Sequence, residues 1–481
     1  MSELVDIKTV VEDGTARSAK STSVDIDDGF DPAVIKALKR KIDWKLVPPL
    51  AALYAISLID RNNLGLAGEA GMTAELKLNI DNRYSHAVVA FFPPYVALEL
   101  FSNIGMRRVG ARWWLPSAVV VWSLCLFGTA FVKNWQGLTA FRAILGMAEA
   151  TLFPGTVYLL SCWYPRREIA TRMTAFFVAG SACAAWSSLL AYGLSKIHTG
   201  STLYGWRWIY LGESLLSLVV AIPCYWLIVD FPSSHRCKFL SEEEKRIVAT
   251  RIERDRADSE PDGLTITKVA KYAADLKLWA FAYCYCSTTL ASYAMSYFSP
   301  RIIASMGFKG VDLYLLLVPP AVLAICWGLP MARWSDKTGC RLPFMILNSV
   351  IAMTGLSLFA FLPVHATAGR YFGIFIATAG LHCNIPLTSS ASQTAIRGQA
   401  KRAYTSALVV GFGGVGGIIA PFVFRQKDSP RYFFGVKFVL ISQGIAIAVC
   451  LVLGAWFRHC NRLAERGRKI IEEHPEFRYQ I

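Results

Sequence analysis

Long apolar segments recur along the whole chain, and each has about the length that crosses a lipid bilayer. A helix needs about 20 apolar residues to span the hydrocarbon core. Runs of this kind occur at residues 46–67, 84–104, 114–132, 137–162, 172–196, 208–230, 278–299, 312–334, 342–363, 369–392, 403–424 and 433–457. The pattern predicts an all-α membrane protein with twelve transmembrane helices.

One long polar segment follows the sixth run and divides the series six and six. Within it, Ser241 and Glu244 of FLSEEEKRIVATRIERD form the pattern of a capping box, which predicts an amphipathic helix on the cytoplasmic side. Residues 1–40 are polar and carry no signal peptide. We therefore expect a disordered cytosolic N-terminal tail at 1–40, a six-helix bundle at 41–232, a cytosolic linker at 233–275, a second six-helix bundle at 276–457 and a cytosolic C-terminal tail at 458–481.

Charge supports a membrane location and indicates an orientation. Only 17% of the residues are charged, yet the net charge is +16. The basic residues form short clusters between apolar runs, so we expect no nucleic-acid partner. The larger clusters lie on one side, around Lys36–Lys45 and in the loops that begin at Arg107, Arg166, Arg333 and Arg397. The positive-inside rule then puts both termini in the cytosol, and we expect the plasma membrane.

The two halves of the chain repeat weakly. RRVGAR at 107–112 and DKTGCR at 336–341 occupy the same loop in each half, and both fit a charged–basic–x–Gly–x–Arg pattern. Repeated six-helix halves are typical of an alternating-access transporter whose binding site lies between them. The glycine-rich run GFGGVGG at 411–417 lies within an apolar segment, so it predicts close helix packing or a hinge and no phosphate loop.

Four charged residues lie inside the first and fourth predicted membrane helices. Asp60 and Arg61 are adjacent in the first, and Arg142 and Glu149 stand two turns apart on one face of the fourth. Each charge near the bilayer centre costs ~2.5–3.5 kcal/mol, so the four are expected to face a shared hydrated cavity. Arginine matches carboxylate geometry, and a buried carboxylate can carry a proton. The alternative is a charge cluster that only joins the two helices.

Weaker candidates lie in the tenth predicted helix. His382 is either a substrate ligand or a core histidine, and Ser390 and Gln393 belong to a polar stripe that either lines the site or packs helices. The sequence holds no metal-ligand pair, nucleophile elbow or histidine cluster, so we expect no metal, no cofactor and no enzymatic activity.

Several longer stretches resemble the major facilitator superfamily and, within it, fungal anion:cation symporters of the allantoate permease type. The similarity runs from about residue 40 to 460 and is carried by IDRNNLGLA, RAILGMAEATLFPGTVYLLSCWYPRREIATR, GWRWIYLGES, FLSEEEKR, YFSPRIIASMGF, PPAVLAICWGLPMARWSDKTGCR and AKRAYTSALVVGFGGVGGIIAPFVFRQKDSPRYFFG. The resemblance implies two six-helix bundles and proton-driven import of a small organic anion, usually a carboxylate. The implied partners are this anion, protons and the lipid bilayer, and we expect a monomer.

The resemblance also implies roles for single residues. Asp60 and Glu149 match the proton-coupling carboxylates, with Glu149 the preferred carrier; Arg61, Arg142 and Tyr95 match substrate-binding positions. A gating motif is implied at Asp336, Lys337, Gly339 and Arg341, with the first-half copy retaining Gly110 and Arg112.

Some positions depart from the family pattern. Ala391 stands where a tryptophan is usual, Thr394 and Ala395 where two asparagines are, Gly413 where an asparagine is common, and Arg107 where the gating motif has an acid. We therefore expect an altered C-terminal half of the site and an unfamiliar substrate. Export of an acidic secondary metabolite from a fungal biosynthetic pathway is the alternative.

Overall fold

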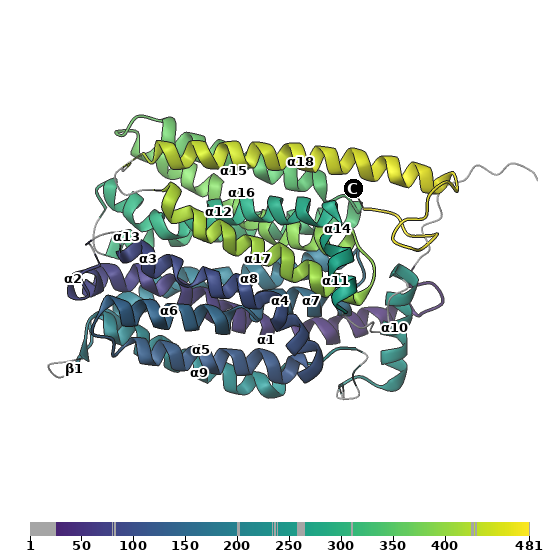
Figure 1. The fold of residues 1–481 in the computed structure, drawn as a ribbon, viewed down its shortest axis with the longest axis horizontal. Coiled ribbons are helices and arrows are strands. Elements are labelled where there is room, and N and C mark those ends of the chain that lie inside the picture. The colour runs from purple at the N-terminus through teal and green to yellow at the C-terminus, as the bar shows by residue number, and fades with distance from the viewer. Residues whose placement is uncertain are drawn as a thin grey trace, which may run out of the picture.

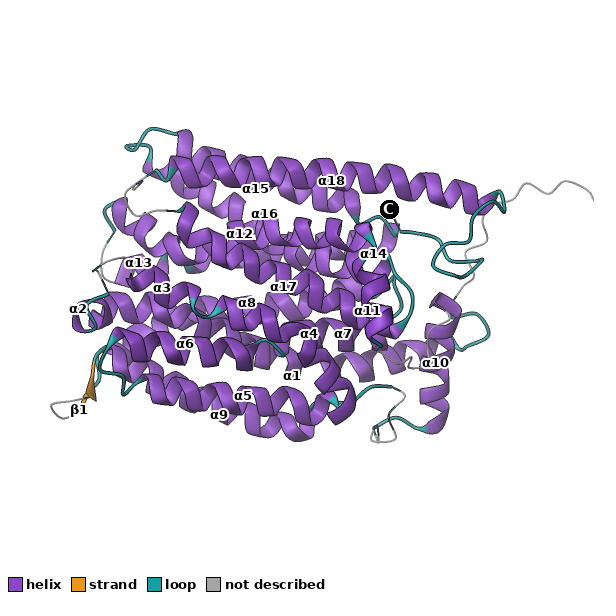
Figure 2. Ribbon diagram, viewed as in Figure 1, coloured by secondary structure: helices purple, strands orange, loops and turns teal. Residues whose placement is uncertain are grey.

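The computed structural model describes residues 26–78, 80, 83–199, 203–232, 234, 237, 239–256, 265–308, 311–424, 428 and 431–480. Long helices run side by side along the molecule, and the two halves of the chain form separate layers in Figure 1. Helices account for almost all of the drawn chain in Figure 2. The fold is an all-α membrane protein, as the apolar pattern predicts.

Each half contributes six membrane-crossing segments, some of them broken into two helices. The first half holds α1 (Pro32–Ala67), α3 (Arg83–Val89) with α4 (Phe92–Val109), α5 (Ala111–Thr129), α6 (Trp135–Glu149) with α7 (Leu152–Trp163), α8 (Ile169–Ser195) and α9 (Trp206–Leu227). The second holds α12 (Leu276–Ser305), α13 (Val311–Leu315) with α14 (Val318–Thr338), α15 (Leu342–Phe361), α16 (Thr367–Thr394), α17 (Gln399–Val423) and α18 (Phe433–Glu465).

Short elements lie at the two ends of these bundles. After α1 come a π-helical turn at Gly68–Met72 and α2 (Thr73–Glu75), and a two-stranded antiparallel pair joins β1 (His198–Thr199) to β2 (Leu203–Tyr204). The linker between the bundles holds α10 (Glu242–Arg256) and α11 (Ile266–Ala273). The sequence pattern predicts neither the strands nor α11.

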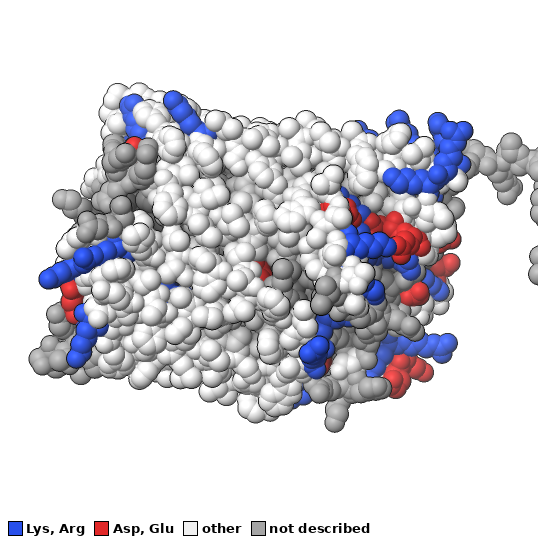
Figure 3. Space-filling model, viewed as in Figure 1, with Lys and Arg blue, Asp and Glu red and all other residues white. Residues whose placement is uncertain are grey.

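The surface shows why the chain resides in a membrane. Eight helices of the described chain are long and apolar enough to cross a bilayer by length and composition. Charged side chains gather at the two ends of the molecule and leave an uncharged band between them, as Figure 3 shows. Large apolar side chains such as Leu215, Trp226 and Val452 are more than 60% exposed on this band. Such a band is stable in contact with lipid and would not be in water.

Most of the charge gathers at one end, which we call the basic end. Figure 1, drawn in the same view as Figure 3, places the start of α1, the α4–α5, α7–α8 and α14–α15 turns and α10 at this end. The predicted capping box forms there, because Ser241 N–H donates to Glu244 at 2.8 Å and Glu244 N–H donates to Ser241 at 3.1 Å. The end of the molecule across the uncharged band from the basic end is called the opposite end.

The two tails are more ordered than the sequence pattern suggests. α1 begins at Pro32, capped by the Asp31 carboxylate at 2.8 Å, so part of the expected disordered tail is helix; residues 1–25 lie outside the described chain. After α18 the chain folds back over the basic end, where Tyr479 stacks on Phe457 at 4.2 Å. Tertiary contacts with α10, α18 and the bundle loops order these segments, and such contacts have no periodic signal in sequence.

Proline residues break two of the membrane segments near the centre of the first bundle. Pro154 has no N–H to bond the carbonyl of Ala150, so the fourth segment ends as α6 at Glu149 and restarts as α7. Pro93 and Pro94 likewise open α4 after the break that follows α3. The two breaks touch, because a Cβ on Gly146 would lie 2.0 Å from the Phe91 carbonyl oxygen.

The glycine-rich run of α17 packs closely against helices on two sides. Gly411, Gly414 and Gly417 face α4 of the other bundle, while Gly413 and Gly416 face α12. A Cβ at any of these five positions would come within 2.9 Å of a neighbouring atom. The prediction of close helix packing is confirmed, and α17 is a tight contact between the two bundles.

Candidate functional site

A cavity of about 240 Å³ lies between the two bundles. Its walls come from α1, α4, α7 and α8 on one side and from α12, α14, α16 and α17 on the other. The outermost lining residues, among them Gly65, Ser188, Ser299 and Leu317, lie near the helix ends that face the opposite end of the molecule. The cavity therefore reaches from the bundle centre toward the opposite end.

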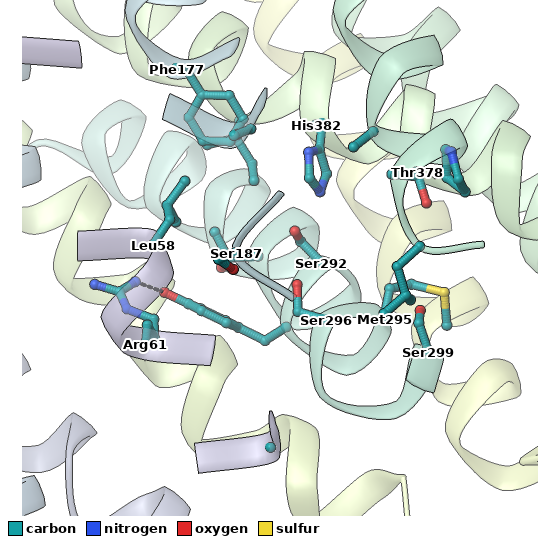
Figure 4. Close-up of a pocket in the computed structure, with 18 of the residues that line it drawn as sticks. Leu58, Arg61, Phe177, Ser187, Ser292, Met295, Ser296, Ser299, Thr378 and His382 are labelled. Carbon is teal, nitrogen blue, oxygen red and sulfur yellow. Dashed lines mark hydrogen bonds between the residues drawn. The ribbon is translucent and has the colours of Figure 1, made fainter. Parts of the chain in front are cut away.

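Arg61 is the only lysine, arginine, aspartate or glutamate among the described residues that line this cavity. Its Nη2 donates to Glu149 Oε2 at 2.7 Å, and its Nη1 donates to the Tyr293 hydroxyl at 2.8 Å. Tyr293 belongs to α12 of the second bundle, so one guanidinium joins the two halves of the molecule. Figure 4 shows Arg61 at the edge of the pocket with this bond to the tyrosine.

Glu149 lies behind Arg61 at the break between α6 and α7. It is 1% exposed and does not line the cavity; Ser57 donates a further bond to Oε2 at 3.3 Å, whereas Oε1 has no hydrogen-bond partner. The pair of Arg61 with Glu149 brings the charges of the first and fourth predicted helices together, as the sequence predicts. The sequence predicts that charges of these two helices meet, but it does not show whether Arg61 or Arg142 pairs with Glu149.

Arg142 does not line the cavity. The Phe91 ring contacts both arginines, 5.2 Å from the Arg61 guanidinium carbon and 5.3 Å from that of Arg142. Arg142 is 2% exposed, and none of its three guanidinium nitrogens has a hydrogen-bond partner among the described residues. The predicted substrate-binding role of Arg142 therefore requires a rearrangement that exposes its guanidinium to the cavity.

Asp60 faces away from the cavity, into the first bundle. Its Oδ2 accepts bonds from Trp122 Nε1 at 3.0 Å and from Ser217 at 2.9 Å. Helix geometry explains this, because adjacent residues on a helix point about 100° apart. The expectation that Asp60 shares the cavity is wrong for this conformation, and its proton-coupling role stays a prediction.

Aromatic and hydroxyl side chains form the rest of the cavity wall. Tyr54 packs in tilted ring contacts with Phe153 and Phe177 on one side, and Tyr95, which the family resemblance singled out, also lines the wall. Ser292, Ser296 and Ser299 follow one another along α12, as Figure 4 shows. The cavity is thus apolar and aromatic near Arg61 and richer in hydroxyl groups toward the opposite end.

His382 lines this cavity, which favours the ligand alternative over a packed core histidine. Its ring lies edge-on to Phe177 at 6.0 Å, and Nδ1 has no hydrogen-bond partner. Gly413 also lines the wall, where an added Cβ would lie 2.4 Å from the Tyr285 ring. Tyr285 thus fills the space that a larger residue at 413 would need.

The polar stripe of the tenth segment lies elsewhere. Ser390 and Gln393 are 0% exposed and do not line the cavity, and neither do Ala391, Thr394 and Ala395. They occupy the half of α16 nearest the basic end, where Ser390 donates to the Leu387 carbonyl at 2.8 Å. Their assignment to the substrate site is corrected for this conformation, because the bundles are closed at that depth. Contact with substrate remains a prediction for a state open at the basic end.

The second-half gating motif closes the basic end. Asp336 accepts the backbone N–H groups of Ala170 and Thr171 at 3.2 and 2.6 Å, and so caps the first turn of α8 in the other bundle. Arg341 pairs with Asp336 at 3.0 Å and also donates to the Arg166 carbonyl. The contact is reinforced by Arg402 of α17, which donates to the Ser161 carbonyl of α7.

The remaining motif residues have local roles. Gly339 ends α14 in the left-handed conformation, with φ of 65°, and Lys337 is exposed. In the first-half copy, Gly110 has φ of 98° between α4 and α5, and Arg112 donates to the Tyr225 carbonyl at 2.6 Å. These first-half bonds stay within one bundle, so the two copies are not equivalent as gates.

The sequence analysis missed several buried polar groups. Glu99 on α4 and Glu213 on α9 are 0% exposed, and no hydrogen bond to their carboxylate oxygens is formed in the described chain. Tyr293 was missed because an aromatic residue in an apolar run has the same pattern as a core residue. Glu99 was detectable, since a carboxylate inside a predicted membrane helix is rare. No group of three His, Cys, Asp or Glu side chains in the described residues could hold a metal ion.

Comparison with known proteins assigns the family. The family model described as Major Facilitator Superfamily matches residues 50–421. The chain belongs to the Major Facilitator Superfamily. It is a multi-pass membrane transporter, and the family resemblance expected from the sequence is confirmed at that level. Several relatives are similar to it over most of the chain.

One relative is the MFS-type transporter efuF of Hormonema carpetanum, 29% identical over 95% of this chain and 92% of that protein. Another is the high-affinity nicotinic acid transporter of Saccharomyces cerevisiae, 28% identical over 97% of this chain and 89% of that protein. Among solved structures, the human organic anion transporter MFSD10 matches with a TM-score of 0.60 at 11% identity, over 85% of this chain and 99% of that one. This last similarity supports the superfamily fold alone.

The gate can be tested through Cys162, which lies beside the Arg402 contact and is 5% exposed. Asp336→Ala removes the cap of α8 and leaves Arg341 buried without its partner, a loss of about 3–5 kcal/mol for a buried pair. We expect faster maleimide labelling of Cys162 in the purified protein, by tenfold or more, measured on its own peptide by mass spectrometry. Asp312→Ala, at the exposed opposite end, is the matched control. Unchanged labelling of Cys162 in Asp336→Ala would remove Asp336 from the gate.

Proposed function

We propose that this transporter is a proton-coupled symporter of a small organic monoanion, and that it belongs to the anion:cation symporter group of the superfamily. The observation that carries the proposal is the position of Arg61. A single guanidinium faces the cavity while its other side is held by the buried carboxylate of Glu149. The Arg61 guanidinium can then exchange its Glu149 partner for the carboxylate of a substrate.

Coupling follows from competition for Arg61. A substrate carboxylate in the cavity can replace Glu149 as the partner of the guanidinium, because both are planar acceptors. Glu149 would then be buried without a counter-charge, and a buried unpaired carboxylate takes up a proton to avoid the cost of ionisation. Anion and proton therefore favour each other's binding, and the coupling is reciprocal.

The walls of the cavity indicate the class of substrate. One cation at one end suits a single carboxylate, and the ring pair of Tyr54 with Phe153 suits a flat or aromatic body. The hydroxyl groups of α12 suit a polar substituent at the far side. The relative described as a nicotinic acid transporter is consistent with this class, since nicotinic acid is an aromatic monocarboxylate.

Orientation, location and assembly follow from the same proposal. We assign the basic end to the cytosol, with both termini there, by the positive-inside rule. The cavity would then be accessible from outside the cell, which suits uptake at the plasma membrane by a monomer. Export of an acidic secondary metabolite is the second candidate, because Gly413, which lines the wall, stands where the group commonly has an asparagine.

The deciding experiment measures proton flux that depends on substrate. Purified protein in vesicles with an internal pH dye is supplied with monocarboxylates that range from aliphatic to aromatic and hydroxylated. Symport predicts that an inward substrate gradient acidifies the vesicle interior, with the largest signal for a cyclic or aromatic acid. Antiport would make the interior alkaline under the same gradient. No proton movement with any transported acid would exclude coupling.

A further inference from the structure

Glu99 is a buried carboxylate that the proposed transport cycle does not use. It lies on α4, is 0% exposed, and neither of its oxygens has a hydrogen-bond partner within the described part of the chain. It does not line the cavity. Tyr95, one helical turn earlier on α4, does line it, so the cavity ends about 6 Å along the helix from Glu99.

The carboxyl group lies directly on the contact between the two bundles. A Cβ on Gly411 of α17 would lie 2.9 Å from Glu99 Oε2, so the carboxyl group rests against the α17 backbone at a position that only glycine leaves open. Gly414 and Gly417 continue the same contact toward the opposite end, against Tyr95 and Phe92. Glu99 thus occupies the dry interface that must separate if the bundles move apart at the basic end.

Glu99 has no directly paired cation among the described residues. The groups that interact with it electrostatically are Tyr95 on its own helix, Tyr285 and Tyr293 on α12, and Arg61 on α1. Arg61 acts on Glu99 only at a distance, because its two printed bonds go to Glu149 and Tyr293.

The other packed helices direct their charges elsewhere. On α17, Lys401 pairs with Glu472 and Arg402 donates to Ser161. On α6, Arg142 lies over Phe91. Arg112 on α5 donates to the Tyr225 carbonyl, and on α7 the electrostatic neighbours of Tyr158 are Cys162, Arg107 and Arg402. An ionised Glu99 would therefore lack a directly paired cation in a buried contact, which disfavours its ionisation.

We propose that Glu99 is a proton-binding site that controls the basic-end gate. The acid is protonated while α4 and α17 are in contact. When the bundles separate at the basic end, water reaches the carboxyl group, its O–H bond breaks, and the proton passes to water at that end while the carboxylate stays hydrated. The bundles close again only after the same group regains a proton from that side.

Two consequences follow. Because the proton enters and leaves at one end, Glu99 adds nothing to the proton:anion ratio; it makes the conformational equilibrium depend on pH at the basic end. Acid pH favours the closed contact, and the open fraction rises by up to tenfold per pH unit as the group ionises. The inference rests on the proposed alternation between two openings, but it does not require any particular substrate.

The test uses substrate-free protein in lipid nanodiscs. Cys162 labelling is measured against that of Cys340, a more accessible thiol at the same end, between pH 5 and 9. The ratio is expected to rise with pH in the wild type and to stay low and flat in Glu99→Gln, which resembles the protonated acid. Glu242→Gln, on the exposed face of α10, is the control and should follow the wild type. A ratio in Glu99→Gln that follows the wild type overturns the proposal.

Infrared difference spectroscopy over the same pH range tests protonation directly. The wild type should contain the carbonyl stretch of a protonated carboxyl group that is absent from Glu99→Gln, and Glu99→Asp should shift that band. Identical spectra overturn the proposal even if one variant is unstable. Glu99→Gln should still transport substrate against a gradient. A change in the number of protons transported per anion in this variant would mean that Glu99 couples transport, which contradicts the assignment. Because the labelling and infrared measurements need no substrate, failure of the symport proposal is distinguishable from failure of this one.

Discussion

Glu149→Gln is expected to exchange substrate across the membrane but to lose all accumulation against a gradient. Glutamine keeps the shape and the bond to Arg61 while removing the group that takes up a proton. In vesicles with the membrane potential clamped, a one-unit pH gradient supports about tenfold accumulation for each coupled proton. The wild type should approach that limit, whereas the variant should stop at equal concentrations inside and outside.

Paired counterflow and pH-driven uptake measurements separate coupling from binding. Counterflow in Glu149→Gln should stay within a few-fold of the wild type, which shows that the site still binds. Glu242→Gln, at the exposed basic end, is the control and should accumulate substrate normally. Continued accumulation by Glu149→Gln would transfer the coupling role to Asp60.

Arg61→Lys is expected to weaken substrate binding by about 10–100-fold, the equivalent of one or two charge-assisted hydrogen bonds. Lysine keeps the charge, but its single ammonium group cannot present the planar fork that bonds Glu149 and Tyr293 together. Because the same side chain joins the two bundles, the maximal rate should change as well. Equilibrium binding of the best substrate from the vesicle screen measures the first effect, and exchange rate the second.

Arg142→Lys gives the informative comparison. Arg142 is buried and does not line the cavity, so the loss of affinity should be smaller unless the site rearranges when substrate binds. Arg333→Lys, on an exposed face of α14, is the control for expression and charge. Equal affinity in Arg61→Lys and the wild type would mean that the charge cluster only joins helices, which was the alternative left open by the sequence.

The closed basic end and the cavity toward the opposite end describe one of the two states that alternating access requires. The gate consists of few contacts between the bundles, chiefly Asp336 with the start of α8 and Arg402 with α7. Helix-capping and charged bonds of this kind break and re-form without loss of helix. The gate can therefore open while the packing within each bundle stays intact.

The sequence by itself determined that the chain forms long helices and that these helices lie in a membrane. Long apolar runs can satisfy their backbone groups in lipid only as helices, so their number and length specify the twelve segments. The glycine-rich run predicted close helix packing or a hinge, and the structure shows the packing. Rare charges inside apolar runs marked Asp60, Arg61, Arg142 and Glu149 as unusual, because each is costly there.

Only the tertiary structure decided which of these groups meet. A helical pattern gives the direction of a side chain relative to its own helix but not the partner helix that it faces. Asp60 therefore turned out to face Trp122 and Ser217, while Arg61 paired with Glu149 and reached Tyr293 in the other bundle. Ser390 and Gln393 lie outside the cavity because the bundles are closed at the basic end. Which end is closed is a property of one conformation, and no local sequence pattern encodes it. The place of Glu99 against Gly411 has the same origin, since it depends on how two helices more than 300 residues apart in sequence pack together.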